Sequence, residues 1–292
     1  MRDYRGTNPG ASVLVARGGD VVFRKSYGMA NIEAGIGASP STHYRLASIT
    51  KQFTAAAIMT LAENGRLSFD DPVRKHLPSL PMWAEPMTIR HLLTHTSGVI
   101  DYESVIPKGM TAQLKDAEVL GMLEGETTTY FPAGTSYRYS NTGYAFLALI
   151  VERVSGMRFA AFLRDQVFGP AGMRSSLAHE DGMSTVPGRA YGYSRDGERW
   201  KRTDQSLTSA VLGDGGIYAS IDELARWLAA LDGGRFAAAA EPLVATSDQE
   251  VHYGFGWRVA EHRGRRTAGH TGETMGFRNA MVRFPEERLA VV

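Results

Sequence analysis

The stretch Ser48-Ile49-Thr50-Lys51 lies where a strand-like run, Tyr44 to Ala47, turns into a long apolar helix. Positions i and i+3 of a helix share one face, so the Ser48 hydroxyl and the Lys51 amine are expected to point into the same space. A serine becomes a nucleophile when a nearby base takes its proton, and a desolvated lysine can lose its charge and act as that base. The helix N-terminus adds backbone N–H groups suited to a developing oxyanion.

Ser48 has a simpler interpretation when the tetrapeptide is taken alone. Serine is among the residues preferred at the N-cap of a helix, and Ser-x-x-Lys arises by chance about once in a chain of this size. On this motif alone, capping is favoured over catalysis. The motifs described below reverse that weighting.

The composition is that of an ordinary globular chain with little net charge. Its 292 residues are 43% hydrophobic and 22% charged, with a net charge of +1, and this length supports a sizeable core. There is no electrostatic reason to expect nucleic acid or an anionic membrane as a partner. The cluster Arg263, Arg265 and Arg266 is interpreted as a solvated hairpin. The sequence contains no cysteine, which excludes disulfides, thiolate zinc sites and cysteine nucleophiles.

The two ends of the sequence bear on location and completeness. The longest apolar runs, such as Tyr144 to Val151, are too short to span a bilayer. Residues 1–5 lack the apolar segment of a signal peptide. This slightly favours a cytoplasmic location, with a periplasmic or secreted protein whose signal was removed as the alternative. Because termini rarely stop inside a buried strand, the apolar run that ends at Val292 leads us to expect truncation at one or both ends.

Both ends of the chain have the pattern of strands. Residues 11–17 and 21–27 are predicted strands joined by the hairpin turn Gly18-Gly19-Asp20. Further short strands, separated by Gly- and Pro-containing turns, are predicted at residues 253–260, 265–271, 276–284 and 287–292. The simplest assembly is one antiparallel sheet built from both chain ends.

The middle of the chain carries helical spacing instead. Helices are predicted at residues 49–63, 88–95, 111–124, 141–154, 157–167 and 220–232, and Ser220 to Glu223 reads as a capping box for the last of them. A sheet from both ends with an inserted helical region is an α+β arrangement. We expect residues 1–47 plus 233–292 to form the sheet region and residues 48–232 the mainly helical region. A cleft between the two is the default place for a site.

Two further motifs accompany Ser48 and Lys51. Tyr139-Ser140-Asn141 follows the turn at Gly134 and precedes a predicted helix, so it lies on an ordered loop. His270-Thr271-Gly272 is expected near the start of a strand that can form the wall of the cleft.

Together these motifs resemble those of the serine β-lactamase and penicillin-binding-protein superfamily. The likeness is strongest to the class C-like branch, which includes class C β-lactamases, family VIII carboxylesterases, D-aminopeptidases and DD-carboxypeptidases. It runs from about residue 9 to the end of the chain. It rests on Leu46-Ala47-Ser48-Ile49-Thr50-Lys51, Leu92-Leu93-Thr94-His95-Thr96-Ser97-Gly98, Tyr139-Ser140-Asn141, Gly215-Gly216-Ile217-Tyr218 and Gly269-His270-Thr271-Gly272.

The resemblance implies a β-lactamase/transpeptidase-like fold and a role for each matching residue. Ser48 would attack a carbonyl and carry the acyl group, with Lys51 helping to remove its proton. Tyr139 would be the partner base and then the acid toward the leaving group. Asn141 would bind the acyl side-chain amide of the substrate. The backbone N–H groups of Ser48 and Glu273 would form the oxyanion hole.

The strand motif departs from the family pattern. Class C β-lactamases carry Lys-Thr-Gly where this chain has His270-Thr271-Gly272, and a histidine is largely neutral near pH 7. The change weakens the case for efficient β-lactam hydrolysis, and a purely structural His270 is the alternative. Gly272 is expected to leave room for substrate along the strand. Glu273 is hypothesised to select neutral or amine-bearing substrates, unless it only points to solvent at a strand edge.

Other active-site types fit the sequence less well. The Gly-x-Ser-x-Gly elbow of an α/β-hydrolase does not occur. His91 and His95 have the i, i+4 spacing of zinc ligands, but the glutamate of a zinc-protease helix is missing between them, which favours a structural role. Tyr137 and Tyr144 are interpreted as packing residues. Residues 101–103 are expected to shape the pocket.

The predicted function is that of a serine hydrolase acting on small ester or amide substrates, with a carboxylesterase-like activity ranked first. D-aminopeptidase or DD-carboxypeptidase activity and β-lactamase activity are the alternatives within the enzyme class. The alternative of another class is a non-catalytic binding module, which would predict the loss of a catalytic residue. The predicted partner is a small-molecule ester, amide or β-lactam, with no cofactor and no metal. The sequence leaves the oligomeric state open.

Overall fold

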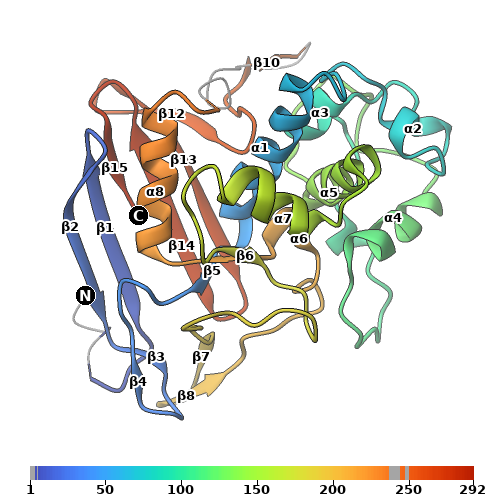
Figure 1. Cartoon of the computed structure of the whole chain (residues 1–292). Coiled ribbons are helices and arrows are strands. Elements are labelled where there is room, and N and C mark those ends of the chain that lie inside the picture. Colours follow the sequence, from blue (N-terminus) through green and yellow to red (C-terminus); the bar gives the residue numbers. More distant parts are fainter. Residues whose placement is uncertain (1–3, 5, 237–243, 247–249) are drawn as a thin grey trace.

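The computed structural model describes residue 4 and residues 6–236, 244–246 and 250–292. Its largest sheet is antiparallel and contains strands from both ends of the chain, in the order β12-β13-β14-β15-β1-β2. These strands are β1 (Ala11–Arg17), β2 (Asp20–Tyr27), β12 (Arg258–His262), β13 (Arg265–Thr274), β14 (Phe277–Phe284) and β15 (Leu289–Val291). Figure 1 shows the blue N-terminal and red C-terminal strands side by side, which confirms the predicted α+β fold class.

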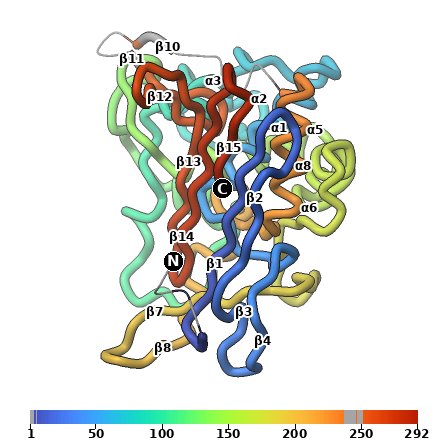
Figure 2. The backbone as a smooth tube through the Cα atoms, turned by 90° about the vertical axis from the view of Figure 1, so that its left-hand side faces the viewer, coloured from blue at the N-terminus to red at the C-terminus, as the bar shows by residue number. Residues whose placement is uncertain are grey.

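The register of the sheet places the two chain ends together. Strand β15 pairs with β1 through Val15↔Val291 and with β14 through Val282↔Val291. The hairpin between β1 and β2 turns at Gly18 and Gly19, whose φ values of 62° and 93° suit glycine. Figure 2 shows β15 between β14 and β1 in the same sheet.

Helix α1 (Thr50–Glu63) lies at the centre of a helical layer beside the sheet. Residues 50–59 of α1 are all buried, because α5 (Asn141–Ser155), α7 (Leu212–Gly215) and the π-helical turn η4 (Leu163–Phe168) surround it. Burial of one side chain such as Phe53 contributes about 2 kcal/mol. The remaining helical elements are α2 (Val73–His76), α3 (Ile89–Leu93), α4 (Asp116–Glu124), α6 (Phe159–Phe162), α8 (Ile221–Asp232), η1 (Ala47–Ile49), η2 (Met82–Ala84) and η3 (Tyr102–Ser104).

Helix α8 lies against the sheet, although it falls within the predicted helical region, residues 48–232. It contacts β1 and β2, as Figure 1 shows. Its Trp227 ring packs 4.6 Å from the Phe53 ring of α1, so one side chain joins the sheet layer to the helical layer. The Ser220 hydroxyl accepts from Glu223 N at 3.2 Å. The Glu223 carboxylate instead accepts from Ser175 N and from the Ser176 hydroxyl, so the predicted capping box is only half formed.

Several predicted elements begin later or end earlier than their patterns indicate. The predicted helix at 111–124 begins only at Asp116, and the predicted helix at 88–95 ends at Leu93. Strand β12 begins at Arg258, after a turn in which Gly254 N donates to Trp257 O. A Cβ atom on Gly256 would lie 2.7 Å from Lys51 O, so this turn packs tightly on the start of α1.

Short strands tie distant segments together, and only one of them, Tyr44–Arg45, falls in a run that is strand-like in the sequence. The three-stranded sheet β5-β9-β6 joins β5 (Tyr44–Arg45), β9 (Ile217–Ala219) and β6 (Leu177–Ala178). It holds the segment before Ser48 against the segment after α7. The two-stranded sheets are β3 (Met29–Asn31) with β4 (Ile36–Gly37), β7 (Tyr193–Asp196) with β8 (Arg199–Arg202), and β10 (Val244–Ala245) with β11 (Glu250–Val251).

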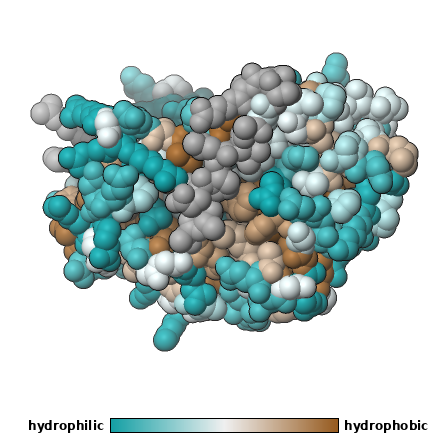
Figure 3. All heavy atoms as spheres, turned by 90° about the horizontal axis from the view of Figure 1, so that it is seen from above, coloured by the Kyte–Doolittle hydropathy of each residue, from teal (hydrophilic) through white to brown (hydrophobic). Residues whose placement is uncertain are grey.

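The outer surface is mixed in polarity. Figure 3, seen from the top of Figure 1, shows mostly hydrophilic side chains on the flanks and apolar side chains toward the middle of that face. On the edge strand β2, Val21, Val22 and Phe23 are exposed. Among the described residues, no helix has the length and apolar character needed to cross a membrane.

Candidate active site

Ser48 lies in the short helical turn η1, between β5 and α1. The residue before it, Ala47, has a φ of 49°, a left-handed conformation that costs an L-residue roughly 1 kcal/mol. This bend sets Ser48 apart from the axis of α1, whose N-cap is Ile49. Neither helical element has a side-chain cap hydrogen bond at its N-terminus, so the interpretation of Ser48 as a capping residue does not describe the structure.

Lys51 is fully buried directly beneath Ser48. Its Nζ atom lies 3.2 Å from Ser48 Oγ, 2.8 Å from Asn141 Oδ1 and 3.1 Å from the backbone oxygen of Asp214. The last two partners are oxygen acceptors. A neutral amine would donate its two hydrogens to them and turn its lone pair toward the Ser48 hydroxyl. The arrangement can therefore accept the serine proton.

Asn141, at the start of α5, is held by its own set of contacts. Its backbone N–H donates to Asp101 Oδ2 at 2.8 Å, and its Nδ2 donates to Glu103 Oε1 at 3.1 Å. The side chain thus bridges Lys51 and Glu103. Desolvation, followed by the negative charge of Asp101, raises the pKa of the Glu103 carboxyl group.

Tyr139 places a buried hydroxyl group at the site. Its hydroxyl is buried and makes no hydrogen bond within the described part of the chain. Its ring centroid lies 4.9 Å from Lys51 Nζ, and the ring packs 4.3 Å from that of His95. Tyr144 differs, because its hydroxyl donates to Leu93 O at 2.8 Å inside the core.

His270 is buried and hydrogen-bonded at both ring nitrogens. Its Nδ1 lies 2.6 Å from Thr271 O, and its Nε2 lies 2.9 Å from the Tyr253 hydroxyl. Since a carbonyl only accepts, Nδ1 carries the proton and Nε2 accepts from Tyr253. Burial, with the charge of Lys51 second, lowers the pKa of His270 to about 3. The ring is therefore neutral at pH 7 and does not replace the charge of a lysine.

Gly272 makes room for backbone rather than for substrate, which corrects our expectation. A Cβ atom there would lie 2.1 Å from Leu46 O and 3.2 Å from Ser48 N. Strand β13 therefore runs against η1, beside the backbone amide of Ser48. The oxyanion hole formed by the N–H groups of Ser48 and Glu273 stays a prediction that this placement favours.

Thr271 and Glu273 have side chains on the exposed side of β13. Glu273 forms a salt bridge with Arg278 at 2.9 Å, and 69% of its side chain is exposed. Its charge is thus partly matched by a neighbouring cation, whereas the Glu103 carboxylate forms no salt bridge within the described part of the chain.

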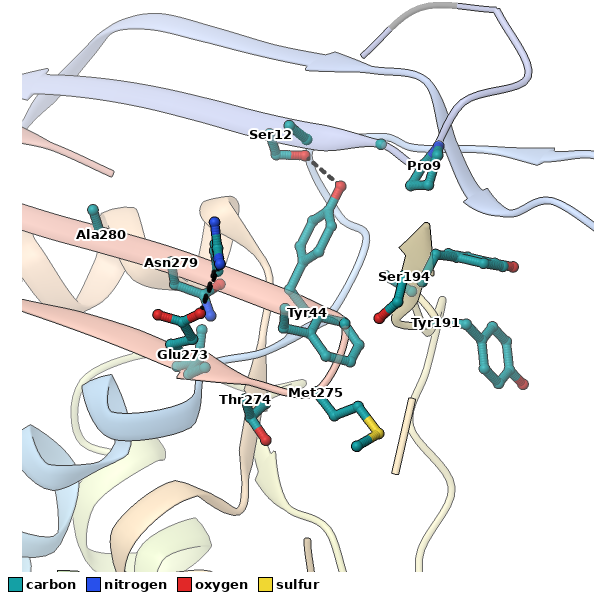
Figure 4. A pocket seen from close by; sticks show the side chains of 18 of the residues that line it. Pro9, Ser12, Tyr44, Tyr191, Ser194, Glu273, Thr274, Met275, Asn279 and Ala280 are labelled. Atoms are coloured by element: carbon teal, nitrogen blue, oxygen red, sulfur yellow. Dashed lines mark hydrogen bonds and ion pairs between the residues drawn. The ribbon is translucent and has the colours of Figure 1, made fainter. Parts of the chain in front are cut away.

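A small pocket of about 50 Å³ opens over Ser48. It is lined by Arg45, Ala47, Ser48, Glu103, Asn141, Thr208, Asp214, Gly215, Glu273 and Thr274. A larger cavity of about 920 Å³ adjoins it and shares Glu103, Thr208, Glu273 and Thr274 with it. Figure 4 shows this cavity, with Ser12 and Tyr44 joined by a 3.0 Å hydrogen bond on one side and Thr274 and Met275 on another.

The larger cavity lies beside the main sheet, where residues 9–12 and residues 277–280 line it. It does not include Ser48, so the small pocket is the candidate site for chemistry.

Sequence reasoning missed two features of this site. Asp214 of α7 lines the pocket and is buried beside Lys51, and its Oδ2 accepts from the Tyr102 hydroxyl at 2.9 Å. The stretch 101–103 was expected only to shape the pocket, yet Asp101 and Glu103 hold Asn141 directly. The sole signal for Asp214 was its place beside the Gly215 motif.

Metal binding is not indicated by the described residues. No group of three or more His, Asp or Glu side chains among them could hold a metal ion. His91 Nδ1 accepts from Thr88 N, and His95 Nδ1 accepts from Ser140 N. Because α3 ends at Leu93, the two histidines do not lie on one helix.

Comparisons of sequence and overall fold relate the chain to known proteins. A family model described as Beta-lactamase matches residues 2–292. Penicillin-binding protein 4* of Bacillus subtilis is 31% identical over 96% of this chain, and the D-aminopeptidase of Gluconobacter oxydans is 31% identical over 97% of it. The chain spans only 66% and 55% of the lengths of these relatives. The crystal structure of a penicillin-binding protein from Bacillus halodurans superimposes with a TM-score of 0.83, at 31% identity, over 96% of this chain and 89% of that one.

Proposed function

Because the chain belongs to the β-lactamase family, we propose that it is a serine hydrolase that forms an acyl-enzyme on Ser48. Its substrates would be small amides and esters whose acyl part carries a free amino group. The observation that carries the hydrolase proposal is the 3.2 Å contact between Lys51 Nζ and Ser48 Oγ, with the other two donors of Lys51 directed to oxygen acceptors.

Acylation begins with proton transfer from Ser48 to Lys51. As Ser48 Oγ bonds to the carbonyl carbon, its proton moves to the neutral amine of Lys51. The carbonyl oxygen becomes an oxyanion, which the N–H groups of Ser48 and Glu273 would stabilise. Asn141 Oδ1 and Asp214 O keep the new ammonium group in place.

Collapse of the tetrahedral intermediate needs an acid for the leaving group. The Tyr139 hydroxyl has no hydrogen-bond partner among the described residues, and its ring centroid lies 4.9 Å from Lys51 Nζ. This hydroxyl would give its proton to the departing nitrogen or oxygen as the C–N or C–O bond breaks. The Lys51 ammonium then restores the phenol proton. Water attacks the acyl-enzyme with the same pair acting as base, which releases the carboxylic acid and regenerates Ser48.

Glu103 supports a preference for amine-bearing acyl groups. Its exposed carboxylate lines the pocket over Ser48 and is oriented by the Asn141 amide. A substrate ammonium group next to the scissile carbonyl would complement it, whereas the carboxylate of a β-lactam would be repelled. His270 is neutral and offers no compensating cation. The Glu273 hypothesis is weaker, since Arg278 already pairs with that carboxylate.

The order of candidate activities therefore differs from the order predicted from the sequence. Carboxylesterase-like activity now follows amidase or aminopeptidase activity, because Glu103 favours an ammonium group that simple esters lack. The 31% identity to a protein named D-aminopeptidase supports the same order and a D configuration at the acyl carbon. Slow β-lactam hydrolysis remains a side activity of the same acyl-enzyme.

The test compares kcat/KM for D-alanine p-nitroanilide, its N-acetyl derivative, its L enantiomer and a chromogenic cephalosporin, with Ser48→Ala as the blank. We expect Ser48-dependent turnover that favours the free amine at least about tenfold, which corresponds to one ion pair of about 1.4 kcal/mol. Glu103→Gln should abolish this preference. Glu124→Gln, at an exposed position on α4, is the matched control. Equal rates on the free and acetylated substrates would overturn the substrate proposal, and turnover in Ser48→Ala would overturn the mechanism.

A further inference from the structure

His95 follows the end of helix α3, and the steps proposed above do not use its side chain. The helix ends at Leu93, and His95 has a φ of 58°. A residue in this left-handed conformation after a helix is usually glycine, because a Cβ atom is strained there. A histidine in such a position indicates that its side chain has a specific task.

The two chain neighbours of Tyr139 are both hydrogen-bonded to His95. The backbone N–H of Arg138 donates to His95 O at 3.0 Å, and the backbone N–H of Ser140 donates to His95 Nδ1 at 3.2 Å. Because an amide N–H only donates, Nδ1 is the acceptor and the ring proton of the neutral imidazole lies on Nε2. The backbone on either side of Tyr139 therefore depends on one residue.

The His95 ring also packs against the Tyr139 ring. Their centroids are 4.3 Å apart, and their planes are inclined by 36°. The rings of Tyr253 and Tyr144 lie 4.6 Å and 5.2 Å from the same imidazole. Only 2% of His95 is exposed, so the imidazole cannot rotate without displacing its neighbours. The Tyr139 phenol thus rests on a side chain that is itself fixed.

The proposed base is held by other parts of the chain. The backbone N–H of Asn141 donates to Asp101 Oδ2, and Lys51 Nζ donates to Asn141 Oδ1. His95 makes neither of these hydrogen bonds. A change at His95 should therefore displace Tyr139 while the base and the nucleophile stay in place.

We propose that His95 is a positioning residue that places the Tyr139 phenol where it can protonate the leaving group. It acts through the hydrogen bond from Ser140 N and through the stacked ring. The inference rests on the proposed function, because Tyr139 is the acid there. It goes beyond that function by assigning the placement of this acid to a residue that transfers no proton itself.

The experiment compares acylation by D-alanine p-nitroanilide with acylation by a p-nitrophenyl ester. The aniline nitrogen needs a proton from the acid as the C–N bond breaks, whereas p-nitrophenolate can leave without one. His95→Phe keeps a ring but removes the acceptor for Ser140 N. We expect anilide acylation to slow about 10²-fold, the effect of a misplacement of about 1 Å, while ester acylation changes little.

His95→Asn is the conservative variant. Asparagine tolerates the left-handed backbone, and its side-chain oxygen can accept from Ser140 N in place of Nδ1. It should therefore restore most of the anilide rate that His95→Phe loses. An anilide rate in His95→Phe equal to that of the wild type would overturn the inference.

His43→Phe is the matched control, because His43 is also a buried histidine with one hydrogen-bonded ring nitrogen, 3.1 Å from Ser175 Oγ. It should leave the ratio of anilide to ester rates unchanged, with melting temperatures confirming that each variant is folded. In a Tyr139→Phe background, His95→Phe should have little further effect on the anilide. Equal slowing of anilide and ester by His95→Phe, or the same loss in that background, would overturn the inference.

A second readout separates this inference from the proposed function. Hydrogen exchange of the Ser140 amide, followed by NMR, reports its hydrogen bond without turnover. Protection should be lost in His95→Phe and retained in His95→Asn. Unchanged protection in His95→Phe would overturn the inference. Full anilide activity in Tyr139→Phe would instead overturn the proposed function, because the acid would then not be needed.

Discussion

Lys51 Nζ and Ser48 Oγ lie 3.2 Å apart across the junction of η1 and α1. The contact depends on both local and distant parts of the chain. The i, i+3 spacing places both side chains on one side of the junction, and Asn141 and Asp214 then fix the amine from α5 and α7. The proposed base is therefore positioned before any substrate binds.

Lys51→Met should nearly abolish acylation, because methionine fills the buried space without a titratable group. General-base catalysis contributes typically about 10²- to 10⁴-fold, so we expect the acylation rate to fall within that range. The burst of p-nitrophenol from an activated ester, followed by stopped flow, measures it. Lys51→Arg is the charged control, and it should be equally slow because a guanidinium group does not release its proton near neutral pH. A normal burst in either variant would contradict the role of Lys51.

Tyr139→Phe should separate activity from stability. The Tyr139 hydroxyl has no hydrogen-bond partner in the described part of the chain, so its removal should leave the free energy of unfolding unchanged or raise it slightly. Turnover of the amide should fall by about 10²- to 10⁴-fold. Urea unfolding and kcat/KM measure the two quantities.

Tyr144→Phe is the matched control for that variant. It removes a buried hydrogen bond to Leu93 O, so it should lower the free energy of unfolding by about 1 kcal/mol while leaving turnover within a few-fold of wild type. The reverse pattern in the two variants would show that Tyr139 is a packing residue.

Gly272→Ala should damage both the sheet and the site. The new Cβ atom would lie 2.1 Å from Leu46 O, so β13 must move away from η1, at a cost of at least about 2 kcal/mol. The unfolding temperature and kcat/KM should both be lower than in the wild type. Gly121→Ala, in α4 with no atom within 4 Å of its Cβ position, should instead be neutral or stabilise the chain by up to about 1 kcal/mol. An active, stable Gly272→Ala would show that the close approach of β13 to Ser48 is not required.

The burial of His270 predicts a loss of stability in acid. The pKa of His270 is about 3 in the folded chain, against about 6.5 when unfolded, so the unfolded state binds more protons between these values. The stability contribution is complete above about pH 6.5 and is lost as pH falls toward 3, at about 1.4 kcal/mol per pH unit.

His270→Gln should therefore flatten the pH dependence of unfolding by about one proton between pH 6 and pH 4. Urea midpoints across this range measure the slope, with His262→Gln as a control at an exposed position. An unchanged slope in His270→Gln would mean that the ring is protonated in the folded state.

The main features of the fold were predictable because they follow from local patterns. Alternation and the Gly18-Gly19 turn predicted β1 and β2, and helical spacing predicted α1 and α5 within one or two residues of their observed bounds. The late start of α4 and the existence of the short strand β9 could not be predicted from local sequence patterns. Strand β9 is only three residues long, and it exists because β5 and β6 pair with it from distant parts of the chain.

In the candidate site too, some residues were predictable from local motifs and others depend on tertiary contacts. Ser48, Lys51, Tyr139 and Asn141 were predicted from motifs, and the structure brings them together. Asp214 and Glu103 belong to no motif, and their importance arises from tertiary contacts with Lys51 and Asn141. The role of Gly272 was misjudged because the nearness of Leu46 O is a property of the assembled layers and not of the strand.

The acyl-enzyme is the central claim, and its direct test is mass spectrometry of the protein quenched during turnover of a p-nitrophenyl ester. The account predicts one acyl group per chain, located by peptide mapping on Ser48, formed far more slowly in Lys51→Met and absent in Ser48→Ala. Acylation of another residue, or turnover that persists in Ser48→Ala, would contradict it.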